Sequence, residues 1–139
     1  MELLDTVFVT VDEGVQGDLR GRVRPGARGR RQVSVLEAES WACAMAELGL
    51  SGSAVLPWHT RRTNFFVEGL RFPRDGGYIV SVGDSLRIRI TLECDPCGRM
   101  DELWPGLEAA LTPDWRGGLL GRVIADGTVA IGDEIRIET

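Results

Sequence analysis

The sequence predicts one domain of mixed α/β class, rich in β-strands, whose sheet closes or nearly closes into a β-barrel with two or three flanking helices. Two observations support this prediction. Six to eight short runs of β-branched and apolar residues are separated by turns, whereas only two or three segments carry a helical pattern. The length of 139 residues, of which 43% are hydrophobic, suits a single domain over residues 1–139.

The first half of the chain combines short strands with one helix. Thr6–Val11 has high β-propensity and precedes a turn at residues 12–14, and Gln32–Leu36 predicts a second strand. Residues 37–48 are expected to be helical and to bury Trp41 and Met45, because these residues share one face and Gly49 is a natural stop. A loop over residues 52–59 and two short strands complete this half: Asn64–Val67 and Tyr78–Val80.

The second half begins with a clear strand signal. Leu86–Leu92 alternates apolar and polar residues after a turn at residues 81–84, which predicts a half-buried strand. After Cys97 a helix is expected to run to about Leu103, to be interrupted around Pro105-Gly106 and to resume over Leu107–Leu111. Three further strands, separated by glycine-containing turns, are expected at Leu119–Ala125, Thr128–Ile131 and Glu134–Ile137.

The composition excludes several mechanisms. All sixteen basic residues are arginines, so a lysine Schiff base and lysine-bound pyridoxal phosphate are excluded, and a Walker-type phosphate loop lacks its lysine. The acidic N-terminus does not resemble a signal peptide and no apolar run reaches the length of a membrane span. Three cysteines, an odd number, fit a reducing compartment. We therefore expect a cytoplasmic protein with no membrane partner.

Positive charge is concentrated in one segment. Residues 20–31 contain six arginines and no acid, whereas the whole chain carries a net charge of −5. This glycine-rich and proline-containing segment predicts a basic loop that either covers a small anionic ligand, such as a phosphate, or is simply solvated. It contains no aromatic residue that could stack on bases and the domain is acidic overall, so no nucleic-acid partner is expected.

The stretch Cys94-Asp95-Pro96-Cys97 carries the strongest chemical signal. It follows the alternating strand, Asp95 is a favourable N-cap, and Pro96 suits the first helical position. Cys97 is then expected at the second helical position, where unpaired amides and the helix dipole favour a thiolate. This makes Cys97 a candidate nucleophile or soft-metal ligand.

Other interpretations of the cysteines remain open. Free cysteines are often buried and inert, and we expect this of Cys43 in its apolar helical pattern, while Cys94 fits either a structural or a functional role. A CxxC pair also occurs in redox dithiols and in half of a zinc site. The single histidine, His59, has no acidic neighbour in sequence, so nothing local supports a catalytic triad. A zinc site from His59 and the three cysteines lacks a second close pair.

The order and spacing of several short motifs resemble the MOSC domain family, named for the C-terminal region of molybdenum cofactor sulfurases. The resemblance covers residues 14–137 and implies a β-barrel-like fold that is associated with molybdenum cofactor (molybdopterin) or with sulfur transfer. The motifs are Gly17-Asp18, Arg31–Ser34, Arg62–Phe65, Gly69-Leu70, Val82–Asp84, Pro96-Cys97, Gly117-Gly118 and the closing hairpin from Asp126 to Asp133.

The resemblance implies roles for individual residues. Cys97, in the Pro-Cys pair, is the implied molybdenum ligand or sulfur carrier and the catalytic residue. The Arg-x-Asn motif places Arg62 and Asn64 at the cofactor site. The family's larger reductases carry an additional N-terminal barrel domain, and its sulfurases a pyridoxal-dependent domain, neither of which is found here.

Three functions are consistent with these roles. One is a cofactor-binding oxidoreductase that reduces N-hydroxylated compounds. The second is a sulfur carrier in which Cys97 holds a persulfide and Cys94 could resolve it as a disulfide. The third is a module that delivers the cofactor without turnover. The expected partners are an anionic small-molecule cofactor and either a cysteine desulfurase or an electron-transfer protein.

Overall fold

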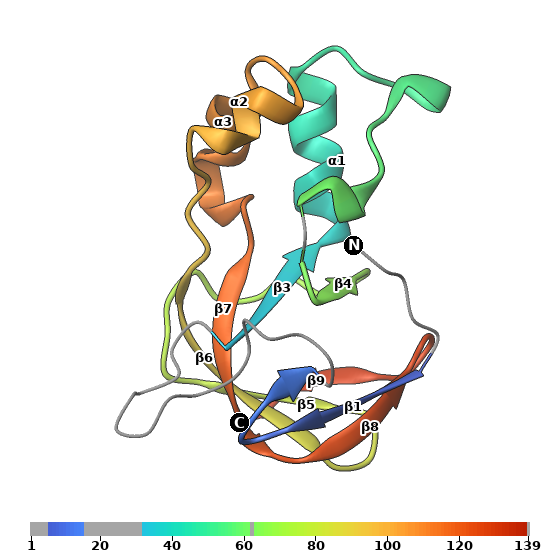
Figure 1. The fold of residues 1–139 in the computed structure, drawn as a ribbon, viewed down its shortest axis with the longest axis vertical. Helices are drawn as coiled ribbons and strands as arrows, with labels where there is room; N and C mark the ends of the chain where they lie inside the picture. The colour runs from blue at the N-terminus through green and yellow to red at the C-terminus, as the bar shows by residue number, and fades with distance from the viewer. Residues whose placement is uncertain (1–5, 16–31, 62, 139) are drawn as a thin grey trace.

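Two β-sheets organise the computed structural model, which describes residues 6–15, 32–61 and 63–138 (Figure 1). The strands are β1 (Thr6–Thr10), β2 (Gly14–Val15), β3 (Val33–Glu37), β4 (Phe65–Val67), β5 (Ile79–Val82), β6 (Leu86–Glu93), β7 (Leu119–Ala125), β8 (Gly127–Ala130) and β9 (Ile135–Ile137). One sheet has the order β4-β3-β7-β6-β5-β9 and curls into a nearly closed barrel; the other has the order β2-β1-β8. Mixed α/β architecture with a nearly closed, strand-rich barrel confirms the predicted fold class.

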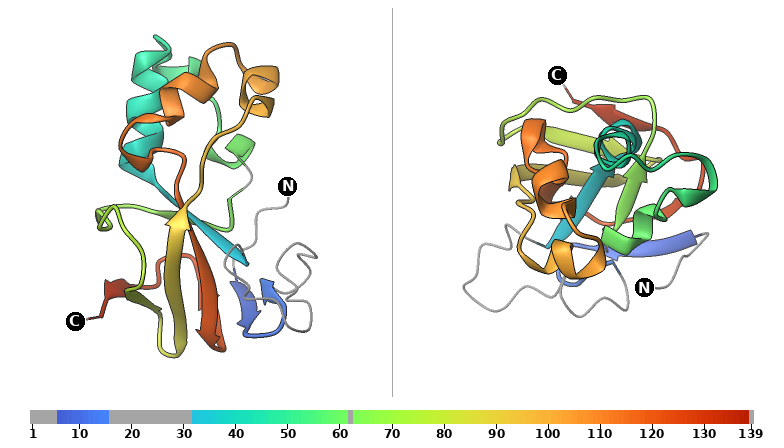
Figure 2. Two further views of the ribbon diagram at one scale, coloured as in Figure 1. Left: turned by 90° about the vertical axis from the view of Figure 1, so that its left-hand side faces the viewer. Right: turned by 90° about the horizontal axis from the view of Figure 1, so that it is seen from above.

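Three helices gather at one end of the strands (Figure 2). They are α1 (Ala38–Glu47), which continues directly from β3, α2 (Arg99–Leu103) and α3 (Leu107–Leu111). Three short 3₁₀ helices lie in the connections: η2 (Gly52–Ala54), η3 (Trp58–Arg61) and η4 (Pro113–Trp115). None of the helices in the described part of the chain is long and apolar enough to cross a membrane.

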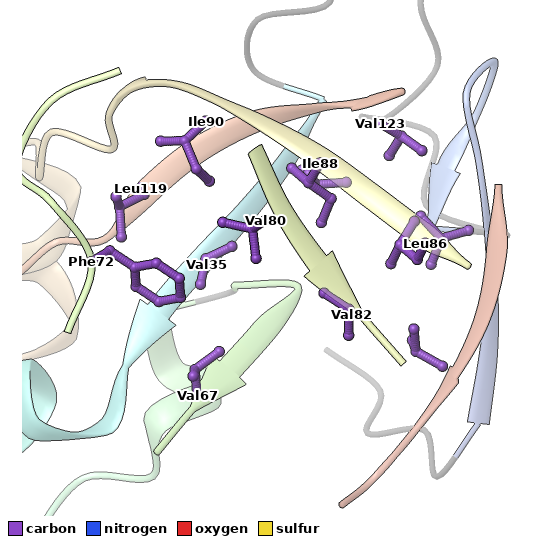
Figure 3. Packing of buried hydrophobic residues seen from close by; sticks show 13 residues of the cluster. Val35, Val67, Phe72, Val80, Val82, Leu86, Ile88, Ile90, Leu119 and Val123 are labelled. Atoms are coloured by element: carbon purple, nitrogen blue, oxygen red, sulfur yellow. The ribbon is translucent and has the colours of Figure 1, made fainter. Parts of the chain in front are cut away.

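The apolar residues form two cores, one inside the strands and one among the helices. The strand core includes Val9 from β1 and Ile88 from β6, so both sheets contribute to it (Figure 3). The helical core contains Trp41 and Met45, as expected from their shared face. Strand β3 serves both cores, because alternate residues of a strand face opposite sides: Val35 points into the first and Leu36 into the second.

Most predicted elements are present, with several boundary corrections. β5 continues through Val82, where we expected a turn from residue 81, because Ser81 and Val82 pair with β9 on one side and with β6 on the other. Gly127 belongs to β8 rather than to a turn, since it pairs with Val9. Cys43 is exposed on α1, so its predicted burial is wrong. The basic segment at residues 20–31 lies outside the described residues.

Candidate functional site

The Pro-Cys pair lies where the chain leaves the barrel for the helical end. β6 and β7 run side by side, and the segment after β6 leads to α2 (Figure 2). The Cys94 N–H donates to the Gly118 carbonyl at 2.9 Å, which extends the β6–β7 pairing by one residue. Residues 94–97 then form a loop that belongs to no helix or strand in the described structure. This segment, the cysteine loop, contains both cysteines of the CxxC pair.

The helix begins later than the sequence predicted. α2 starts at Arg99 with Gly98 in the capping position, and the Met100 N–H donates to the Cys97 carbonyl at 2.9 Å. Asp95 is therefore not the N-cap and Cys97 is not the second helical residue. α2 has five residues, too few to build an extended dipole. The predicted helix-terminus position of Cys97 is wrong, but its thiol is exposed and open to a ligand.

Arg61 connects the cysteine loop to its surroundings. The Nη2 atom of Arg61 donates to the Cys94 carbonyl at 3.0 Å and lies 3.3 Å from the Cys94 Sγ. Its Nε atom donates to the Gly117 carbonyl at 3.2 Å, and its Nη1 atom lies 3.5 Å from the Met100 Sδ. Arg61 thus connects the end of η3 with the exit of β6, the approach to β7 and α2. No local sequence pattern marks Arg61, although it directly precedes the Arg-x-Asn motif.

Gly117 allows the cysteine loop to pack closely. A Cβ atom at this position would lie 2.5 Å from the Cys94 carbonyl oxygen, 3.2 Å from Pro96 Cδ and 3.3 Å from Arg61 Nη2. The first distance is shorter than any real contact of this kind, so a side chain here would displace the loop. Gly117 therefore allows the cysteine loop to pack closely because it has no side chain.

Asn64 forms a polar connection between β3 and the segment that leads to β4. Its Oδ1 atom accepts a hydrogen bond from the Ser34 N–H at 2.9 Å, and its own N–H donates to Ser34 Oγ at 3.1 Å. The Thr63 hydroxyl donates to the same Ser34 Oγ at 3.2 Å. Thr63 and Asn64 are therefore held against β3. Arg62, the other predicted cofactor-binding residue, lies outside the described residues.

Two carboxyl groups flank Cys94 along the chain. Burial raises the pKa of Glu93, and the hydrogen bond and negative charge of Asp95 raise it further. The Glu93 and Asp95 carboxyl groups therefore interact with each other beside the cysteine loop.

A second polar cluster contains a buried carboxylate. Glu37, at the end of β3, is 1% exposed and forms ion pairs with Arg71, at 3.2 Å, and with Arg74. Asp114 in η4 receives a hydrogen bond from Arg74 at 3.3 Å, which is the main reason why its pKa is lowered. Burial lowers the pKa of Arg74, but its hydrogen bonds to Glu37 and Asp114 outweigh this effect and raise it.

The described residues contain no group of three or more His, Cys, Asp or Glu side chains that could hold a metal ion. His59 belongs to η3, the same short helix that ends at Arg61. The structure thus brings Cys94, Cys97 and Arg61 into one region.

A model of the MOSC domain matches residues 16–136, and the chain therefore belongs to the MOSC domain family. Solved structures agree on the fold. YuaD from Bacillus subtilis is 22% identical, with a TM-score of 0.75 over 96% of this chain and 85% of YuaD. YiiM from Escherichia coli is 16% identical, with a TM-score of 0.73 over 100% of this chain and 65% of YiiM. YiiM from Geobacillus stearothermophilus is 15% identical, with a TM-score of 0.70 over 99% of this chain and 62% of that protein.

These identities support the shared fold alone. The chain spans less than two thirds of the length of either YiiM protein. The search of curated proteins gives no match.

Proposed function

We propose that this chain binds molybdenum cofactor (molybdopterin), with Cys97 as the sulfur ligand of the metal and the catalytic residue. Membership of the MOSC family supports the proposal, because the family is associated with this cofactor. The observation that carries it is the exposed Cys97 thiol on a loop that Arg61 and Gly117 fix at the exit of β6.

The chemistry of the site fits such a group. The described residues offer no cluster that could bind a bare metal ion, whereas one exposed cysteine suits a metal whose other ligands belong to the cofactor. When bound, the cofactor supplies oxidation–reduction at the metal, and the protein supplies binding and orientation. If the bound protein turns over, N-hydroxylated compounds are the proposed substrates and an electron-transfer protein is the proposed partner.

Two further residues are proposed to act at this site. Arg62 would bind the phosphate of the cofactor, because a guanidinium matches a phosphate with two parallel hydrogen bonds. Asn64 is the second proposed cofactor-binding residue. Its Oδ1 atom accepts a hydrogen bond from the Ser34 N–H of β3, which holds Asn64 itself beside that strand.

The proposal is tested by expressing the protein in a host that makes molybdopterin and measuring molybdenum and pterin on the purified chain. The wild-type protein should carry both, and Cys97→Ser should lose the molybdenum with its fold intact. Cys43→Ser is the matched control, because Cys43 is also exposed but lies on α1, and it should load normally. Arg62→Ala should weaken loading, and Arg62→Lys should restore part of it.

A wild-type chain free of molybdenum and pterin, or a Cys97→Ser variant that loads as well as wild type, contradicts the proposal. If the wild-type protein does load the cofactor, turnover of an N-hydroxylated compound with a reductant distinguishes an oxidoreductase from a delivery module.

A further inference from the structure

A second thiol lies on the cysteine loop, and it has a cation beside it. The Cys94 side chain is half-buried, whereas Cys97 is exposed. Only Asp95 and Pro96 separate the two cysteines, in a segment outside any described helix or strand. A guanidinium nitrogen of Arg61 lies 3.3 Å from the Cys94 sulfur. Proximity to arginine is one of the conditions that favour a reactive thiolate.

The charge of Arg61 is not balanced by a carboxylate among the described residues. Its acceptors are the carbonyls of Cys94 and Gly117, the Met100 thioether and the Cys94 sulfur, all formally neutral when the thiol is protonated. A partly buried cation is more stable beside an anion than beside neutral groups alone. Among the described contacts of Arg61, the Cys94 sulfur is the group that can ionise to an anion.

Glu93 and Asp95 flank Cys94 and interact with each other. Their negative charge opposes the Cys94 thiolate, whereas the Arg61 guanidinium favours it from hydrogen-bonding distance of the sulfur. Arg61 occupies the side that faces the sulfur, and its hydrogen bonds to two carbonyls hold it there whether or not the thiol is ionised.

We propose that Cys94, Cys97 and Arg61 form a dithiol centre that reacts with small-molecule disulfides. The exposed Cys97 thiolate attacks a disulfide RSSR, forms the mixed disulfide Cys97–S–S–R and releases one RS⁻. The Cys94 thiolate then attacks the Cys97 sulfur, closes the Cys94–Cys97 disulfide and releases the second RS⁻. The two protein thiols are oxidised and the substrate disulfide is reduced to two thiols. Arg61 is the positioning residue, because it holds Cys94 and favours its ionised form.

The experiment follows disulfide exchange in cofactor-free protein that carries Cys43→Ser, with oxidised glutathione as the probe. Cleavage after arginine yields the peptide from Ile90 to Arg99, which contains both thiols, so mass spectrometry distinguishes its three states: dithiol, mixed disulfide and intramolecular disulfide. The parent protein should pass quickly to the intramolecular disulfide. Cys94→Ser should accumulate the mixed disulfide on Cys97.

Two variants test the role of Arg61. Arg61→Gln should close the disulfide roughly three- to tenfold more slowly, because a smaller fraction of Cys94 is ionised, and the mixed disulfide should accumulate before closure. Arg61→Lys keeps the charge and should recover much of the rate. Circular dichroism confirms that each variant is folded, and Arg61→Lys tests the proposal if Arg61→Gln does not fold.

Three outcomes overturn the proposal: no intramolecular disulfide in the parent protein, closure in Arg61→Gln at the parent rate, or closure in Arg61→Lys no faster than in a folded Arg61→Gln. The exchange experiment uses apoprotein and does not depend on molybdenum. Its failure is therefore distinguishable from the failure of cofactor loading.

Discussion

Two arginine-containing clusters join the barrel to the helical end, and they differ in what the arginines contact. Around Glu37, two arginines meet carboxylates: Arg74 binds both Glu37 and Asp114, and Arg71 lies 3.2 Å from Glu37. Around Arg61, the guanidinium contacts carbonyls and two sulfur atoms. In the first cluster, the charges of the two arginines are balanced by the carboxylates of Glu37 and Asp114. In the second, the described partners of Arg61 include no carboxylate.

This difference indicates a structural role for the Glu37 cluster and a functional role for the Arg61 cluster. Glu37 is almost fully buried, so its charge is stable only because the arginines compensate it. Arg61, in contrast, has no carboxylate partner among the described residues. Its charge therefore favours a negative group on the cysteine loop, either the Cys94 thiolate or a bound ligand.

Removing the charge of Glu37 should destabilise the protein strongly. Glu37→Gln leaves Arg71 and Arg74 without their buried partner, and we expect a loss of about 3 kcal/mol in the free energy of unfolding. Glu134→Gln is the control, because Glu134 and Arg136 form an ion pair between exposed side chains and should contribute less than about 1 kcal/mol. Urea denaturation measures both. Equal losses of stability in the two variants would show that the buried Glu37 cluster contributes no more than an exposed ion pair.

A methyl group at Gly117 should disturb the cysteine loop. Gly117→Ala forces a Cβ against the Cys94 carbonyl oxygen, at 2.5 Å in the unrelaxed structure, and should cost about 2 kcal/mol of stability. Gly98→Ala is the matched control, because a Cβ at Gly98 meets no atom within 4 Å. Thermal denaturation compares the two variants. A neutral Gly117→Ala variant would mean that the loop is not fixed by this contact.

A smaller effect is expected in acid, at a site far from the cysteine loop. Hydrogen bonds from Arg87 and Ser81 lower the pKa of Glu138 from 4.5 to about 2. Because the folded-state pKa is the lower one, the contribution of Glu138 to stability is present above pH 4.5 and is lost as the pH falls towards about 2. Glu138→Gln should therefore lose less stability than wild type over this interval. Thermal denaturation across this pH interval measures the loss. An equal loss of stability in the two proteins would contradict this role of Glu138.

Much of the fold could be predicted because local patterns and tertiary packing agree. The alternation of residues 86–92 is the pattern of a strand with one buried face, and β6 spans Leu86–Glu93. Trp41 and Met45 were placed correctly because α1 buries one face. Cys43 was misplaced because a single apolar residue in a helical pattern does not reveal which face it occupies. β5 was predicted too short because its pairing with β9 depends on residues far along the chain.

The site was harder to predict than the fold. Asp95 and Pro96 have the chemistry of a helix start, but Cys94 remains paired to Gly118 and the cysteine loop delays α2 to Arg99. Tertiary pairing therefore overrode a local capping preference. The importance of Arg61 depends on four contacts with residues 33 to 56 positions away in the chain, which no local pattern reveals.

The contrast between the two clusters is tested most directly by the reactivity of Cys94 towards iodoacetamide. In the Cys97→Ser variant two thiols remain, Cys94 beside Arg61 and the exposed Cys43 on α1, and their alkylation rates are measured in the same sample at neutral pH. Adding Arg61→Gln should slow Cys94 roughly three- to tenfold and leave Cys43 unchanged. A Cys94 rate that stays the same or rises in the folded Arg61→Gln protein would contradict the account of Arg61 as a cation that favours the thiolate.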